Sequence, residues 1–146
     1  MEKTYIMVKP HFANFPAVIN LVKKEAITAG MQIIDEKFIK YSTADAQKHY
    51  AEHFRGSYEN AKGFYKELEN YITSDKAYGM VMVGENAITE MRTIIKRLRQ
   101  EVPAMLGEEP RMTENVLHGS DCVESANNEI EIFKTLQAVE SIENEI

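Results

Sequence analysis

Residues 115–126 have the sequence Asn-Val-Leu-His-Gly-Ser-Asp-Cys-Val-Glu-Ser-Ala, and this stretch is the most informative part of the chain for fold and function. His118 is predicted to lie in a short loop just ahead of a helix. Asp121 and Glu124 are expected to cap that helix, which continues through Phe133. Such a position exposes the imidazole beside the positive end of the helix, a setting suited to phosphate.

The predicted helix also brings a carboxylate toward the histidine. Cys122, Ser125 and Glu129 have the spacing that puts side chains on one helix face. Glu129 is therefore expected to point back toward the loop and orient the ring of His118. A nucleophile with an orienting carboxylate is the arrangement that covalent catalysis needs. On spacing alone, however, a histidine before a helix is more often a surface or structural residue.

The rest of the chain predicts strands and helices in alternation. In order, these are a strand at 4–8, a helix from Pro16 to a stop at Gly30, a strand at 31–41, a helix opened by Ser42 that runs through Phe54, a helix at 61–73, a strand at 77–83 and a helix at 86–100. Residues 101–115 include two prolines and a glycine and are expected to form a loop.

This order predicts an α+β fold in which helices are layered on one side of a sheet. We expect a ferredoxin-like βαββαβ arrangement, with a four-stranded antiparallel sheet covered by helices. That arrangement needs one more strand, which is expected near residues 115–117 or hidden within 31–41. The chain shows no internal repeat or linker, so residues 1–146 are expected to form a single domain.

Composition narrows the class of protein. A chain of 146 residues with 44% hydrophobic and 27% charged residues is typical of one globular domain. The net charge of −6 disfavours nucleic acid as the main partner, because binding to it depends on Lys and Arg. The single cysteine, Cys122, fits a reducing compartment. No apolar run suggests a membrane span or a signal peptide, so a cytoplasmic protein is expected.

The stretch at 115–126 closely resembles the active-site signature of nucleoside diphosphate kinases, N-x-x-H-G/A-S-D-S-x-E-S-A. Cys122 stands where the family usually has Ser. The resemblance covers most of the chain. Further similar segments are TYIMVKP at 4–10, HYAEH at 49–53, GFY at 63–65, YITS at 71–74, GMV at 79–81, GENA at 84–87, and Arg92.

The resemblance implies a phosphotransferase that moves the γ-phosphate of ATP onto a nucleoside diphosphate through a phosphorylated His118. By the same resemblance, several other residues are expected to form the site. Glu129 and Ser120 would support the ring, Lys9 and Tyr50 would line the phosphate site, Arg92 and Asn115 would contact phosphate and sugar, and Phe64 and Met112 would hold the two faces of the base. Mg²⁺ is expected to arrive bound to the nucleotide phosphates.

Some segments depart from the family. The family's Lys-Pro-Asp is Lys9-Pro10-His11 here, and Asn14-Phe15-Pro16 replaces its Arg-Gly. The family's long loop after Arg92, which supplies a threonine and an arginine, has been rebuilt. The threonine has no clear counterpart, and the arginine is assigned to Arg99 with Arg97 as a rival. Because that loop contributes to subunit contacts in the family, a homo-oligomer is expected but a dimer, a tetramer and a hexamer all remain open.

Two alternatives complete the interpretation. His49 and His53 have the i, i+4 spacing that zinc can use, but the sequence shows no third ligand, so both are expected to be structural and no metal site is predicted.

The rival function is a nucleotide sensor on the same fold that has lost turnover with its loop. RNA binding is disfavoured by the acidic charge and by the absence of aromatic and basic strand motifs.

Overall fold

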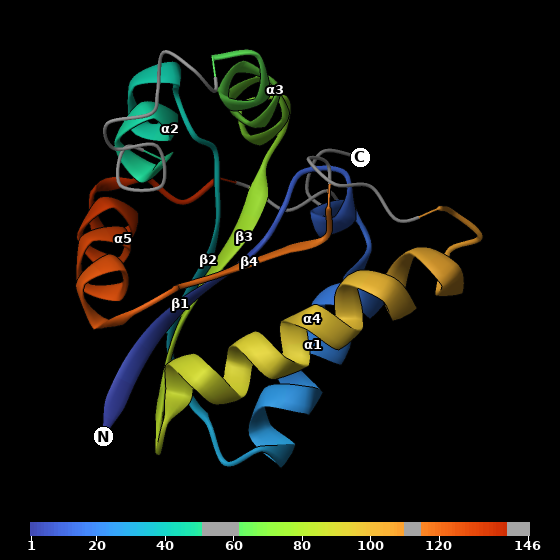
Figure 1. The fold of residues 1–146 in the computed structure, drawn as a ribbon, viewed down its shortest axis with the longest axis vertical. Helices are drawn as coiled ribbons and strands as arrows, with labels where there is room; N and C mark the ends of the chain where they lie inside the picture. Colours follow the sequence, from blue (N-terminus) through green and yellow to red (C-terminus); the bar gives the residue numbers. More distant parts are fainter. Residues whose placement is uncertain (51–61, 110–114, 140–146) are drawn as a thin grey trace.

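A four-stranded antiparallel sheet forms the centre of the molecule (Figure 1). The computed structural model describes residues 1–50, 62–109 and 115–139. The strands are β1 (Glu2–Val8), β2 (Gln32–Ile39), β3 (Ala77–Gly84) and β4 (Leu117–Gly119), and their order is β2-β3-β1-β4. This is the expected ferredoxin-like arrangement, with β4 as the strand that the sequence had not resolved.

Helices cover both faces of this sheet, so the expectation of helices on one side is wrong (Figure 1). One face carries α1 (Pro16–Thr28), α4 (Ala87–Met105) and the short 3-10 helix η1 (Phe12–Asn14), and the other carries α2 (Thr43–Tyr50), α3 (Lys62–Ile72) and α5 (Val123–Thr135). The reason lies in β1, where both alternating sets of side chains are apolar. Ile6 and Val8 enter the first core, and Tyr5 and Met7 enter the second.

A register shift explains the imperfect alternation of β2. The pairing of β2 with β3 is irregular between Ile33 and Asp35, and the side chain of Ile34 between them is exposed. An extra residue at a bulge reverses the inward and outward order along a strand. The pattern in this segment therefore switches phase without ending the strand.

Helix α4 extends further than the sequence indicated. Residues 101–105, which were expected to begin a loop, form its last turn despite Pro103. Leu98 and Val102 are fully buried one turn apart, and Arg97 bonds Glu101 at 2.8 Å across the same turn. Burial and this i, i+4 pair outweigh the hydrogen bond that proline removes.

Helix boundaries follow local signals in most places. Pro16 begins α1, and Gly30, just after its end, has a φ of 90° that favours glycine. Ser42 and Asp45 form a capping box at α2, in which Asp45 N–H donates to Ser42 Oγ at 3.1 Å. The expected cap of α5 is wrong, because the N-cap is Cys122 and the carboxylate of Asp121 pairs with Arg92 instead.

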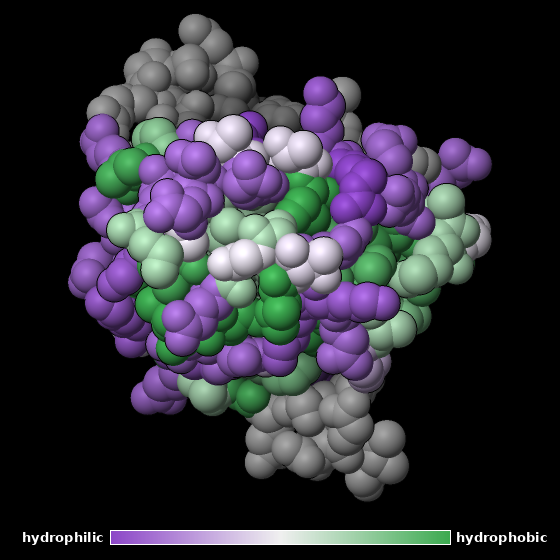
Figure 2. Space-filling model, turned by 90° about the horizontal axis from the view of Figure 1, so that it is seen from below, coloured by the Kyte–Doolittle hydropathy of each residue, from purple (hydrophilic) through white to green (hydrophobic). Residues whose placement is uncertain are grey.

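The outer surface is mixed in character. Seen from below, hydrophilic residues cover most of the molecule, with hydrophobic ones showing between them (Figure 2). Among the described helices, none combines the length and the apolar character that crossing a bilayer requires.

Candidate active site

His118 lies in the edge strand β4, opposite Met7 of β1. It is only 6% exposed, so the expectation of an exposed imidazole in a loop is wrong. Because side chains alternate along a strand, the ring projects to the face covered by α2 and α5. There its centroid lies 4.5 Å from that of His49 and 6.2 Å from that of Tyr5. The ring is therefore buried among polar and aromatic groups.

A carboxylate from α5 holds the ring of His118, as expected. Nε2 of His118 lies 2.8 Å from Oε1 of Glu129, which is itself buried. The same Oε1 accepts a hydrogen bond from Ser120 Oγ at 2.9 Å. Ser120 in turn accepts the backbone N–H of Tyr5 at 3.0 Å. Two bonds on one oxygen and an anchored serine fix the direction from which the carboxylate meets the imidazole.

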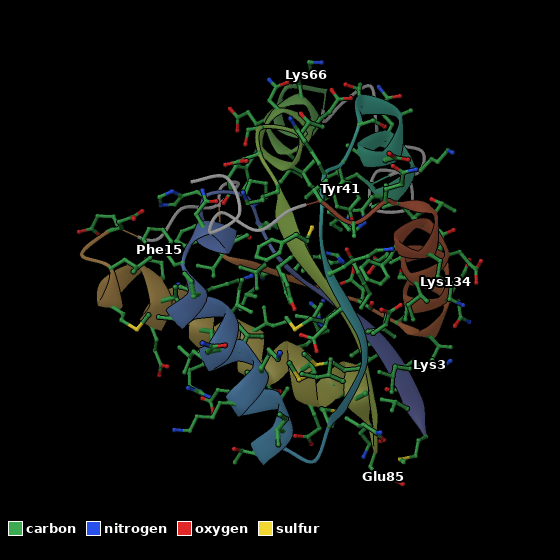
Figure 3. All side chains as sticks on the ribbon, turned by 180° about the vertical axis from the view of Figure 1, so that it is seen from behind. Lys3, Phe15, Tyr41, Lys66, Glu85 and Lys134 are labelled. Atoms are coloured by element: carbon green, nitrogen blue, oxygen red, sulfur yellow. The ribbon has the colours of Figure 1, made fainter. Side chains whose placement is uncertain are left out.

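Two buried tyrosines, Tyr5 and Tyr41, support this chain of hydrogen bonds. The hydroxyl of Tyr5 bonds that of Tyr41 at 2.8 Å, and Tyr41 lies on the segment between β2 and α2 (Figure 3). Burial raises the pKa of both phenols well above the usual value, so both remain neutral. Neutral, packed aromatic groups give the imidazole and its carboxylate a rigid support.

Lys9 and Arg99 provide positive charge near β4. Lys9 follows β1 directly, and its N–H donates to Val116 O at 2.9 Å, which extends the pairing of β1 with β4. Its side chain is buried, and burial together with the charge of Arg99 lowers its pKa to about 7. Arg99 donates from Nη2 and Nε to Leu117 O at 2.8 and 3.1 Å. The arginine thus lies against the backbone next to His118.

Arg97, the rival of Arg99, faces another way. It donates to Glu101 at 2.8 Å and pairs with Glu25 of α1, on the far side of α4 from β4. Two residues along a helix differ in direction by about 200°, so both arginines cannot serve one site. The geometry brings Arg99, and not Arg97, to the strand of His118.

A groove of about 590 Å³ runs between α4 and the end of β4. Its described lining is Ile88, Thr89, Arg92, Thr93, Ile95, Lys96, Arg99, Gly119 and Asp121. Three cations line it against one carboxylate, and that carboxylate pairs with Arg92. Gly119 allows the close packing beside His118, since an added Cβ would lie 2.5 Å from Ile95 Cδ1. The groove therefore has a net positive wall suited to phosphate, and it borders β4 on the α4 side, whereas the ring of His118 projects to the other face.

Of the remaining predicted site residues, the structure describes the side chains of some and not of others. Tyr50 is buried in α2, where its ring packs edge-on against His49 at 4.8 Å. Asn115 is partly buried just before β4. The side chain of Phe64, and the whole of Met112, lie outside the described residues, so their predicted contacts with the base are not tested.

Tyr71 is a positioning residue that the sequence reasoning did not single out. Its hydroxyl is directed at the carbonyl oxygens of Pro10, at 2.6 Å, and Asn115, at 3.1 Å. It thereby joins the segment after Lys9 to the segment before His118. Its membership in the similar segment at 71–74 was the available signal, but no pattern indicated this contact.

The sequence and the structure of this chain are similar to those of known proteins. The sequence pattern of the family described as nucleoside diphosphate kinase matches residues 2–139. A nucleoside diphosphate kinase from Bacillus licheniformis is 35% identical over 137 residues, which cover 91% of this chain and 88% of that one. Among solved structures, the Aquifex aeolicus nucleoside diphosphate kinase is 28% identical, with a TM-score of 0.70 and coverage of 90% and 94%. The Encephalitozoon cuniculi nucleoside diphosphate kinase is 25% identical, with a TM-score of 0.75 and coverage of 99% and 98%.

Proposed function

The chain belongs to the nucleoside diphosphate kinase family, and from its site we propose that it transfers the terminal phosphate of a nucleoside triphosphate to a nucleoside diphosphate through a phosphorylated His118. The observation that carries this proposal is the 2.8 Å bond between His118 Nε2 and Glu129 Oε1. The carboxylate accepts a hydrogen bond from Nε2–H, and in the neutral ring this leaves the lone pair on Nδ1. Nδ1 is therefore the proposed nucleophile.

The proposed reaction has two matched steps. In the first, the Nδ1 lone pair of His118 forms a bond to the γ-phosphorus, and the bond from that phosphorus to the bridging oxygen breaks. The bonding electrons leave with the nucleoside diphosphate. In the second step, a terminal phosphate oxygen of another nucleoside diphosphate attacks the phosphohistidine and the electron pair returns to Nδ1. Glu129 stabilises the positive charge that the ring carries between these steps.

Positive charge around β4 supports this chemistry. The phosphoryl group in transfer spreads negative charge over its oxygens, and preorganised cations stabilise it. Lys9 and Arg99 are buried or half-buried beside the strand of His118, so little water screens their charge. Arg92, now paired with Asp121 at the groove, is proposed to contact phosphate as well. Tyr50 and Asn115 are proposed to complete the phosphate and sugar contacts, and Phe64 and Met112 the base site.

Magnesium is expected as a companion of the nucleotide. The groove beside α4 offers the single carboxylate of Asp121 among the cations of its described lining, whereas Mg²⁺ prefers several oxygen ligands. We propose that the ion is held by the substrate's phosphates and water, where it neutralises part of their charge.

The homo-oligomer and the cytoplasmic location inferred from the sequence stay predictions.

A labelling experiment tests the proposed function. The protein is incubated with ATP labelled in its γ-phosphate, separated from nucleotide, and then given an unlabelled nucleoside diphosphate. We expect covalent, acid-labile label on the protein that leaves as labelled triphosphate when the diphosphate is added. A nucleotide sensor without turnover would bind ATP and never acquire the label, which would refute the proposal.

The two neighbouring arginines of α4 provide a matched comparison. We expect Arg99→Gln to lower kcat/KM by about 10- to 100-fold, because charge-assisted contacts to phosphate contribute about 1.5–3 kcal/mol. Arg97→Gln, which removes a pair with Glu25 on the other side of the helix, should stay within about twofold of the unchanged enzyme. Steady-state kinetics on the two variants, together with their thermal midpoints, check this assignment. Equal losses in the two would contradict it.

A further inference from the structure

We propose that His49, His118 and Glu129 form a binding site for a divalent transition-metal ion of the Zn²⁺ type. One ligand atom from each of these residues can be chosen so that all three lie within 4.8 Å of one another. The residues come from α2, β4 and α5, which are far apart in the sequence. From the sequence, His49 and His53 had the i, i+4 spacing that zinc can use, but no metal site was predicted. His53 lies outside the described residues.

The distances suit a metal after small side-chain movements. Zinc bonds of about 2.0–2.2 Å in a tetrahedron put neighbouring ligand atoms about 3.4 Å apart. The imidazole of His118 and the carboxylate of Glu129 already approach to 2.8 Å. The ring of His49 lies edge-on to that of His118, with an interplanar angle of 66° and centroids 4.5 Å apart. Binding an ion then requires side-chain movements that bring ligand atoms now within 4.8 Å of one another to about 3.4 Å.

The ligand set determines which ion is preferred. Two imidazoles and one carboxylate are a three-ligand set that zinc accepts, with a fourth position for water. Mg²⁺ prefers oxygen ligands and binds imidazole poorly. The three residues are 1%, 6% and 2% exposed, so their surroundings limit the positions that their side chains can take. Ser120, which donates to Glu129 Oε1, provides the outer hydrogen bond that orients a carboxylate ligand.

Metal binding and phosphorylation exclude each other at this site, a consequence that rests on the proposed function. An ion on Nδ1 of His118 occupies the attacking lone pair directly. An ion on Nε2 displaces the proton from that nitrogen, and the neutral ring then keeps its one proton on Nδ1. In both cases no Nδ1 lone pair is available to attack phosphorus. Zn²⁺ is therefore expected to inhibit the protein by a route that excess Mg²⁺ does not relieve.

Direct metal binding tests the site without nucleotide. Metal-free protein is titrated with Zn²⁺ in competition with a chromophoric chelator, and we expect one ion per chain. His49→Gln and Glu129→Gln should each weaken binding at least tenfold. The matched controls are His11→Gln, which changes an exposed histidine, and Cys122→Ser, which removes the exposed thiol. Both should keep the affinity of the unchanged protein, and loss of binding in either control would overturn the proposal.

A second measurement protects the test against misfolding. If His49→Gln does not fold, imidazole NMR signals of the unchanged protein decide the matter, because a bound ion must shift those of both His49 and His118. Shifts confined to other histidines would overturn the site. The proposed function can fail separately, since a chain that binds Zn²⁺ but never acquires label keeps the site and loses the kinase proposal. Labelling that proceeds unchanged at saturating Zn²⁺ would refute the mutual exclusion.

Discussion

His118→Ala is expected to abolish covalent labelling and to lower phosphate exchange by about four orders of magnitude or more. The reason is that the proposed reaction passes through a bond to this ring, and loss of a nucleophile removes most of a covalent enzyme's rate enhancement. The measurement is the labelling and chase described above, together with kcat from a coupled assay. Glu129 and Ser120 remain in this variant, so nucleotide binding should change little by comparison.

His11→Ala is the matched control for this prediction. His11 is an exposed histidine between β1 and η1, and it pairs with Glu108 at 3.0 Å. Its label and turnover should match those of the unchanged protein. A His118→Ala protein that still exchanged phosphate at an appreciable rate would reject His118 as the nucleophile.

Lys9→Met is expected to lower kcat/KM by about 10²- to 10³-fold, the size of effect seen when one preorganised group that stabilises transition-state charge is removed. Lys9 is buried, and it lies close enough to Arg99 for the arginine's charge to lower its pKa. Methionine keeps most of the volume of the side chain and removes its charge. Lys3→Met is the control, because Lys3 lies on the exposed outer part of the same strand (Figure 3).

The pH dependence gives the Lys9 prediction a second measurement. The pKa of Lys9 is about 7 in the folded protein and 10.5 in its ordinary state, which represents the unfolded chain. As pH rises through about 7, the free enzyme loses this charge, so kcat/KM should fall. Between about pH 7 and 10.5 the unfolded chain binds one more proton than the folded one. The free energy of unfolding should therefore rise with pH there, by up to about 1.4 kcal/mol per pH unit.

Both slopes should be absent in Lys9→Met. Denaturant unfolding at several pH values measures the free energy of unfolding, and steady-state kinetics over the same range measure the pH profile of kcat/KM. If the variant kept the alkaline fall in kcat/KM, that fall would belong to another group and Lys9 would not be the charge on which phosphate binding depends.

Local signals in the sequence were sufficient for most elements of the fold. Pro16 and Gly30 bound a helix, and Ser42 with Asp45 starts another, because each acts through backbone geometry or a hydrogen bond within a few residues. The predictions were wrong where contacts between residues far apart in the sequence compete with such local signals. Asp121 has the right chemistry for a cap, yet its carboxylate pairs with Arg92. Residues 101–105 contain a proline but remain helical because their neighbours are buried.

For this protein, the sequence by itself determined the family, and it indicated both a ferredoxin-like fold with one strand left unlocated and the approach of Glu129 to His118. These depend on a contiguous motif and on helical periodicity, which a linear chain displays directly. Only the tertiary structure decided that the imidazole is buried, that Arg99 and not Arg97 faces β4, and that His49 joins the ring and its carboxylate. Each of those features depends on which residues meet across the sheet, and burial, charge and pKa follow from that meeting and not from the order of residues along the chain.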